Sequence, residues 1–145
     1  MGVKFLLFIC FLYCGFKSAN GQIGIASHEK SISKIVVYYL PKDRGGPIGI
    51  TDSNIRNISI TSKFEISDSL CLSEIQKNIV RLKKIKAGHV MRSIYLLCDI
   101  EYRNGTKTSI SFEKAQSGVT KFQGKMYENS PQLETWIIGC INKSF

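Results

Sequence analysis

A two-residue alternation over residues 94–113 constrains the fold of this chain more than any other feature. The apolar side of its first half consists of Ile94, Leu96, Cys98, Ile100 and Tyr102. The turn residues Asn104 and Gly105 follow, and the apolar side then continues with Ile110 and Phe112. Alternation on both sides of an Asn-Gly turn is typical of a half-buried hairpin. The pattern predicts strands over residues 92–103 and 106–113.

The length of the hairpin loop follows from the rule that the buried face sets the register. A two-residue Asn-Gly loop would pair Ile100 with Ser109 and so set a core residue against a polar one. One more loop residue pairs Ile100 with Ile110 and Asp99 with Ser111. We therefore predict a loop of three or five residues, or an equivalent bulge.

The polar side of this hairpin carries two carboxylates and one guanidinium close together. In the predicted register the polar face consists of Asp99, Glu101, Arg103, Lys107, Ser109 and Ser111. Two carboxylates can perform acid–base chemistry where burial separates their pKa values. Here both are expected to be exposed beside Arg103, so cross-strand charge pairing accounts for them. We interpret this face as the solvated side of a sheet.

The rest of the chain supplies more strands and two segments of helical spacing. Residues 32–41 are β-branched and aromatic on both faces, which is typical of a central strand. Alternation returns over residues 57–66, and the segments VTKF and KMY around Gly124 predict a second, short hairpin. The helical segments are residues 69–86 and 131–141.

Both helical segments carry end signals. Asp68 or Ser69 can cap the first helix, and Gly88 is its expected stop. Ser130 followed by Pro131 is a strong start for the second. The predicted fold class is α+β: a single domain, mainly an antiparallel sheet of five to seven strands packed with two helices. The expected core includes Val36, Ile79, Leu82, Leu96, Ile100, Phe112 and Trp136.

Residues 1–21 have the features of a secretory signal peptide. Lys4 precedes an apolar run over residues 5–16, and that run is shorter than the roughly 20 residues that a membrane span needs. We expect cleavage before Gln22, a mobile leader over residues 22–31, and export of the remaining domain, residues 32–145, to the periplasm or the exterior.

Three cysteines remain after the predicted cleavage: Cys71, Cys98 and Cys140. At most one internal disulfide can form among three thiols, and Cys71 with Cys140 is one candidate pair. Buried free thiols are the alternative. The spacings include no CxxC pair of the kind that zinc sites use. We predict neither a metal site nor a cofactor.

The exported chain is basic, because 20 Lys and Arg residues less two in the signal, against 11 acidic residues, leave 18 − 11 = +7. The densest cluster is RLKKIK, residues 81–86, which on the predicted helix is either a solvated face or an anion-binding patch. The glycine-rich loop 42–54 is the other part of the predicted contact surface. The candidate binding residues are Lys42, Arg44, Arg81, Lys83, Lys84 and Lys86. The expected partner is a protein or an acidic surface rather than nucleic acid.

The last third of the exported chain resembles small exported bacterial proteins of uncharacterised function. A strand ending in DIEYRNG, a second strand, a GKMY segment and an end helix follow one another. The residues that carry the resemblance are Tyr102, Asn104, Gly105, Gly124, Lys125 and Tyr127. The resemblance implies export and no particular activity.

No convergent set of catalytic residue types is present, so an exported, non-catalytic binding or interaction protein is the leading hypothesis. A small basic nuclease-like hydrolase would need His89 beside Glu101 or Glu113, with Arg92 or Arg103, in one cleft. An inhibitor or immunity protein would instead expose a loop or a sheet face with aromatic side chains. A structural envelope component is the remaining alternative.

Overall fold

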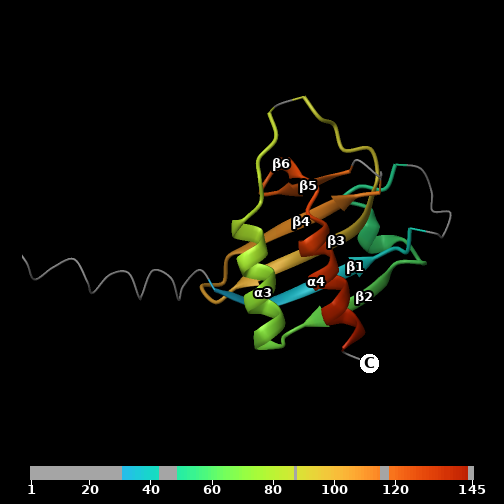
Figure 1. Cartoon of the computed structure of the whole chain (residues 1–145). Coiled ribbons are helices and arrows are strands. Elements are labelled where there is room, and N and C mark those ends of the chain that lie inside the picture. Colours follow the sequence, from blue (N-terminus) through green and yellow to red (C-terminus); the bar gives the residue numbers. More distant parts are fainter. Residues whose placement is uncertain (1–30, 43–48, 87, 115–117, 144–145) are drawn as a thin grey trace, which may run out of the picture. The chain divides into compact units, whose positions relative to one another are not determined.

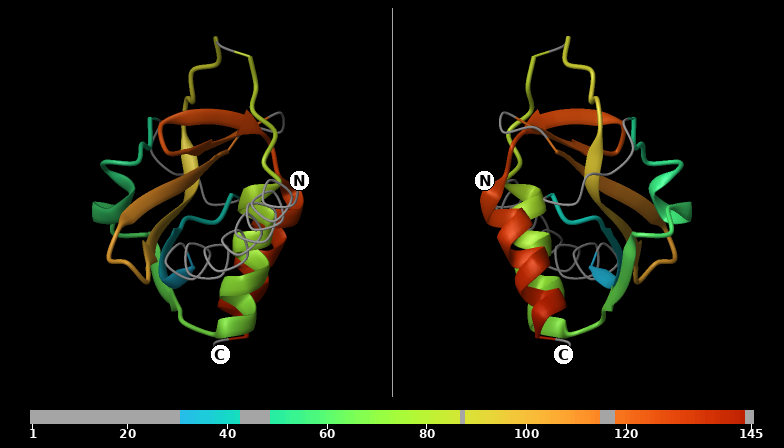
Figure 2. Two further views of the ribbon diagram at one scale, coloured as in Figure 1. Left: turned by 90° about the vertical axis from the view of Figure 1, so that its left-hand side faces the viewer. Right: turned by 90° about the vertical axis from the view of Figure 1, so that its right-hand side faces the viewer.

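A computed structural model describes residues 31–42, 49–86, 88–114 and 118–143 of the chain (Figure 1). Its frame is an antiparallel sheet of six strands in the order β2-β1-β3-β4-β5-β6. The strands are β1 (Ile32–Tyr39), β2 (Ser62–Ile66), β3 (Ile94–Tyr102), β4 (Lys107–Glu113), β5 (Val119–Phe122) and β6 (Lys125–Glu128). Two helices, α3 (Ser69–Val80) and α4 (Pro131–Asn142), lie across one face of this sheet (Figure 2). The predicted α+β fold is confirmed.

The predicted signal peptide, and the predicted leader except for Ser31, lie outside the described residues. The carbonyl of Ser31 accepts a hydrogen bond from Arg103 N–H at 2.9 Å, so this residue extends the pairing of β1 with β3. None of the helices in the described part of the chain is long and apolar enough to cross a membrane.

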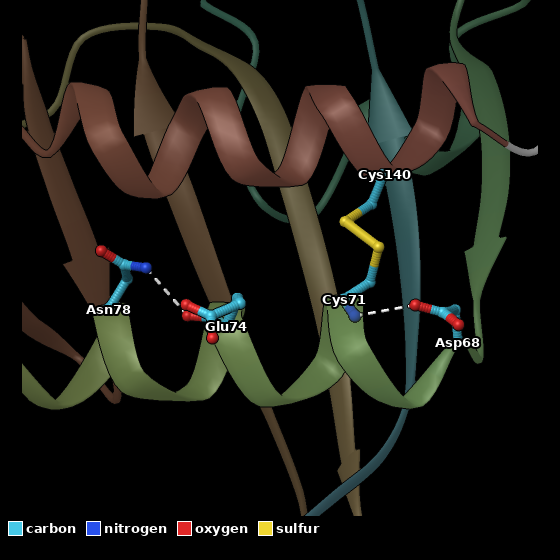
Figure 3. Close-up of a disulfide and its surroundings, with 5 residues drawn as sticks. All are labelled: Asp68, Cys71, Glu74, Asn78 and Cys140. Carbon is cyan, nitrogen blue, oxygen red and sulfur yellow. Dashed lines mark hydrogen bonds between the residues drawn. A yellow bond between two sulfur atoms is a disulfide. The ribbon is translucent and has the colours of Figure 1, made fainter.

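The main core lies between the sheet and the two helices. Ile35 and Val37 of β1, Ile75 of α3 and Ile137 of α4 have no exposed surface. Burial of a side chain of this size contributes about 1.5–3 kcal/mol, so this layer supplies most of the folding free energy. The cysteine pair named above forms here: a disulfide joins Cys71 to Cys140, with Cα atoms 6.0 Å apart, and so links α3 to α4 (Figure 3).

Four of the seven predicted core residues are buried: Ile79, Leu96, Ile100 and Phe112. The prediction was wrong for Val36, Leu82 and Trp136, which are half-buried. Val36 belongs to the sheet face opposite the helices, Leu82 follows the end of α3, and Trp136 packs against the edge of the core. Residues at the boundary of a core satisfy the same periodicity as residues at its centre.

The β3–β4 hairpin has the predicted three-residue loop, Arg103 to Gly105, closed by Tyr102 N–H to the carbonyl of Thr106 at 2.9 Å. Its register differs from the prediction by two residues, since Ile100 pairs with Thr108 and Asp99 with Ser109. The apolar faces still coincide, because strand side chains repeat every two residues. Gly105 has φ of 79°, as the last position of such a loop requires.

The short second hairpin, β5–β6, is confirmed, with Gln123 and Gly124 as its two-residue turn. Both residues have positive φ (50° and 72°), the conformation that a tight hairpin turn needs. Helix α4 also agrees with its prediction and begins at Pro131. These elements were identified correctly because their signals are local.

Two predicted boundaries were wrong. The 57–66 segment is not one strand: a 3-10 turn, η1 (Ile55–Asn57), comes first, and β2 begins only at Ser62. Helix α3 begins as predicted, with the Asp68 carboxylate accepting the Cys71 N–H at 2.8 Å (Figure 3), but it ends at Val80 and not at residue 86. Gly88 is therefore not its stop.

A small second core covers part of the sheet face opposite the helices. It consists of Leu40, Ile50, Ile55, Ile94 and Leu97. The η1 turn and its neighbours lie over the sheet on that side (Figure 2). The hairpin face that was predicted to be solvated is therefore buried near the end of β4, where Ser111 is 1% and Glu113 6% exposed.

Candidate functional site

The RLKKIK cluster does not continue helix α3: Arg81 and Leu82 form the turn that ends the helix, and residues 83–85 pair with β6. Ile85 N–H donates to the carbonyl of Met126 at 3.2 Å, and Glu128 N–H donates to the carbonyl of Lys83 at 2.8 Å. Lys84 lies opposite Tyr127 in an isolated antiparallel bridge. The segment thus satisfies backbone groups along the outer edge of β6, which a longer α3 would leave without partners. This pairing corrects the predicted basic helix end.

A basic groove of about 420 Å3 follows from this pairing. Its lining residues are Lys84, Ile85, Lys86, Gly88, His89, Lys125 and Met126. We call this feature the basic groove. The lining thus combines three lysines and a histidine with the apolar residues Ile85 and Met126, and it includes no acidic residue among those that the structure describes. The groove is suited to a negatively charged group attached to an apolar body.

The lysines of the basic groove are not neutralised within the part of the chain that the structure describes. Lys84, Lys86 and Lys125 form no ion pair with any described carboxylate. Five other lysines each contact a carboxylate within 4 Å: Lys34, Lys42, Lys77, Lys107 and Lys121. Positive charge is therefore concentrated at this edge of the sheet.

His89 is the one groove residue with a side-chain partner among the described residues. Its Nε2 atom lies 3.0 Å from Oε2 of Glu113, at the end of β4. Glu113 also accepts hydrogen bonds from Arg92 N–H at 2.9 Å and Val119 N–H at 3.3 Å. Burial raises the pKa of Glu113, but these three donors outweigh burial, and the net pKa is lowered. Glu113 is thus an anion that fixes both the connection that precedes β3 and the connection between β4 and β5.

The predicted binding residues do not all meet at the basic groove. Lys84 and Lys86 line it, whereas Lys83, which precedes Lys84 in the chain, is not among the lining residues. Lys42 instead contacts Glu134 at 3.0 Å and stacks on the ring of Tyr95, 4.2 Å from its centroid. Arg44 lies outside the described residues.

Loop 42–54 is not a free surface loop in its described part, residues 49–54. Ile50 is 2% exposed, and its carbonyl accepts the Ile94 N–H at 2.9 Å. Asp52 contacts Lys121 of β5 at 2.8 Å. This part of the loop packs on the sheet because it carries an apolar side chain that the second core buries.

Arg81 lines a separate and larger hollow of about 840 Å3 between α3 and the first residues of β1. Its polar lining consists of Ser31, Ser33, Ser67, Ser69, Ser73, Gln76, Lys77, Arg81 and Arg103. The five predicted binding residues that the structure describes are therefore divided between different surfaces.

Sequence reasoning did not include Lys125 or His89 in the predicted patch. The turn at Gln123 and Gly124 indicated the strand that carries Lys125. No local signal indicated that this strand lies beside residues 83–85, since the two segments are about forty residues apart and are joined by backbone hydrogen bonds, which any residue types can make.

The carboxylates on the open face are paired, but only Glu101 has the predicted cross-strand partner, because the partner of Asp99 is Arg56 of the η1 turn. Asp99 accepts a hydrogen bond from Arg56 Nε at 3.0 Å, and this contact raises the pKa of Arg56. Glu101 lies 3.4 Å from Lys107. Both carboxylates are about one third exposed and have a cation beside them. This part of the face is a charge-paired surface.

The hydrolase hypothesis is met only in part. His89 lies next to Glu113, one of the two carboxylates considered, whereas Glu101 pairs with Lys107. Arg92 donates its backbone N–H to Glu113, and Arg103 lines the separate hollow beside α3. The described lining of the basic groove includes no arginine. No group of three or more potential metal ligands occurs among the described residues.

No family model, no curated protein and no solved structure matches this chain. The resemblance to small exported bacterial proteins therefore stays a prediction.

Proposed function

We propose that this protein is an exported, non-catalytic binding protein that captures an acidic partner through the basic groove. The observation that carries the proposal is the gathering of unpaired lysines in one groove. Lys84, Lys86 and Lys125 line it without carboxylate partners among the described residues, whereas Lys34, Lys107 and Lys121 of the sheet have such partners. Concentrated like charge raises the association rate and the affinity for an oppositely charged surface.

Two further features support export and binding. The Cys71–Cys140 disulfide suits an oxidising compartment, such as a periplasm or the cell exterior. Residues 83–85 are hydrogen-bonded to β6, so the lysines project from a rigid edge. A pre-organised surface binds with a smaller entropic cost than a flexible one.

The proposal is tested with the chain beginning at Gln22, applied to immobilised heparin and to immobilised poly-L-glutamate. The groove variant changes Lys84, Lys86 and Lys125 to Gln. The control changes Lys63, Arg103 and Lys143 to Gln; these cations also form no ion pair with described residues, and none of them lines the basic groove. Both variants lose the same net charge.

We expect the groove variant to elute from both resins at a clearly lower salt concentration than the control. Thermal stability should be nearly unchanged in both variants, because exposed substitutions usually alter stability by about 0.5 kcal/mol or less. Equal shifts for the two variants would show that retention follows net charge alone, and the proposal would fail.

A nuclease-like hydrolase is the second candidate, and the His89–Glu113 contact is the observation that favours it. A buried carboxylate can orient an imidazole for proton transfer. Hydrolysis of single-stranded or double-stranded nucleic acid that is lost in His89→Gln, with the fold intact, would support this candidate. Absence of turnover in the wild-type protein would remove it.

A further inference from the structure

The connection between α3 and β3 projects beyond the rest of the domain. In both views of Figure 2 this connection rises above the β5–β6 hairpin and the ends of the helices, as it does in Figure 1. Gly88, His89 and Val90 of this connection are exposed, and the side chain of Val90 is among the most exposed apolar groups of the described residues, at 79%. We call residues 88–90 the loop tip.

The loop tip is supported on both sides. On one side, the backbone of Lys83 and Ile85 is hydrogen-bonded to β6. On the other, Glu113 binds the His89 ring and the Arg92 N–H, and Ser93 accepts the Lys114 N–H at 2.8 Å. A held backbone therefore presents an apolar side chain to solvent at the loop tip.

The loop tip borders the basic groove, since Gly88 and His89 belong to both. Lys84, Lys86 and Lys125 line the basic groove next to the loop tip, and Lys83 precedes them in the chain. Long basic side chains with an exposed apolar residue beside them are the combination that peripheral proteins present to anionic bilayers. The ammonium groups reach headgroup phosphates while the apolar residue enters the layer just below.

The shape of this surface favours a bilayer over a folded acidic protein. A stable protein interface buries about 800 Å2 on each partner and has an apolar centre. The loop tip is instead a narrow projection with a single large apolar side chain. A soft surface can close around such a projection, whereas a rigid partner would need a matching cavity.

We propose that the loop tip and the basic groove dock this protein on an anionic lipid surface, with Val90 entering the interface and the lysines binding lipid headgroups. This inference rests on the proposed function, which requires only an acidic partner, and it specifies that partner as a membrane.

The experiment measures co-sedimentation of the chain beginning at Gln22 with phosphatidylcholine vesicles, with and without phosphatidylglycerol. Three variants are compared with the wild type: the Lys84, Lys86 and Lys125 to Gln triple variant, Val90→Ser and Val80→Ser. Val80 is the matched control, because it is 80% exposed but lies on α3.

We expect binding only to vesicles that contain phosphatidylglycerol, with weaker binding as salt is added. The lysine variant should lose about 100-fold in vesicle affinity, since each cation near an anionic surface is worth roughly fivefold. Val90→Ser should lose roughly fivefold through the lost apolar burial. Val80→Ser should bind like the wild type.

Equal affinities of Val90→Ser and Val80→Ser would overturn insertion of the loop tip. Absence of vesicle binding, together with lysine-dependent retention on heparin and poly-L-glutamate, would reject the membrane and leave an acidic protein or polymer as the partner. If the protein binds no vesicles and its retention on those resins does not depend on the lysines, both the membrane proposal and the proposed function are rejected.

Discussion

His89 and Glu113 connect the projecting loop to the sheet: the imidazole Nε2 of His89 lies 3.0 Å from a carboxylate oxygen of Glu113. The Glu113 side chain is only 3% exposed. The same carboxylate accepts backbone N–H groups from Arg92 and Val119, on either side of β4. A buried anion with three donors is a satisfied structural group. The position of the loop tip therefore depends on one residue of β4.

Glu113→Gln should destabilise the protein by about 2 kcal/mol at neutral pH, because hydrogen bonds to a buried charged group contribute about that amount. Folding lowers the pKa of Glu113, so its ionised form stabilises the native state above the unfolded pKa of about 4.3. This stabilisation is lost as the pH falls through the folded pKa. The difference between wild type and variant should thus shrink on acidification.

Urea unfolding of both proteins, at neutral pH and at about pH 3, measures this difference. Glu65→Gln is the control, since Glu65 is exposed and only 3.9 Å from Lys34, and it should change little at either pH. A wild-type advantage that stays constant between the two pH values would contradict the role of the ionised carboxylate.

Replacing Cys71 and Cys140 with Ser should lower the free energy of unfolding by about 4 kcal/mol, the loop-entropy value for a crosslink that spans 69 residues. The double variant should still fold, because the apolar layer between helices and sheet is unchanged. Denaturant unfolding under non-reducing conditions gives the comparison. Equal stability of the variant and the oxidised wild type would show that the crosslink does not restrict the unfolded chain.

Cys98 should resist thiol reagents in the native protein. Its side chain has no exposed surface, and burial raises the pKa of its thiol, so the reactive thiolate is scarce at neutral pH. For the chain beginning at Gln22, titration should count no thiol in the native state, one after unfolding, and three after unfolding with reduction. Rapid labelling of the native protein would mean that β3 opens readily.

The β3–β4 hairpin shows how much a local pattern can establish. Alternation over residues 96–112 indicated the helix-facing side correctly and included the observed three-residue loop among its alternatives, whereas Ile94 belongs to the second core. It could not separate the observed pairing of Ile100 with Thr108 from the predicted pairing with Ile110, because registers two residues apart place the same side chains on the same face. The register was set by the position of the loop, which begins at Arg103.

The RLKKIK segment shows where local pattern is insufficient. Its apolar spacing continues that of α3, yet the helix ends at Val80 and the segment joins the edge of β6. Helical spacing and a short extended segment compete closely in free energy over so few residues. Backbone hydrogen bonds to a distant strand decided the outcome.

The sequence by itself determined the α+β class, the starts of both helices, the hairpin turns and most of the inward faces, because each of these depends on neighbouring residues and a fixed repeat. Only the tertiary structure brought Lys125 beside Lys84 and His89 beside Glu113. Which distant segments meet is set by the register of whole strands and by the burial of a shared core, and no local repeat encodes that register. The charge of the basic groove was present in the sequence, but its location depended on β6.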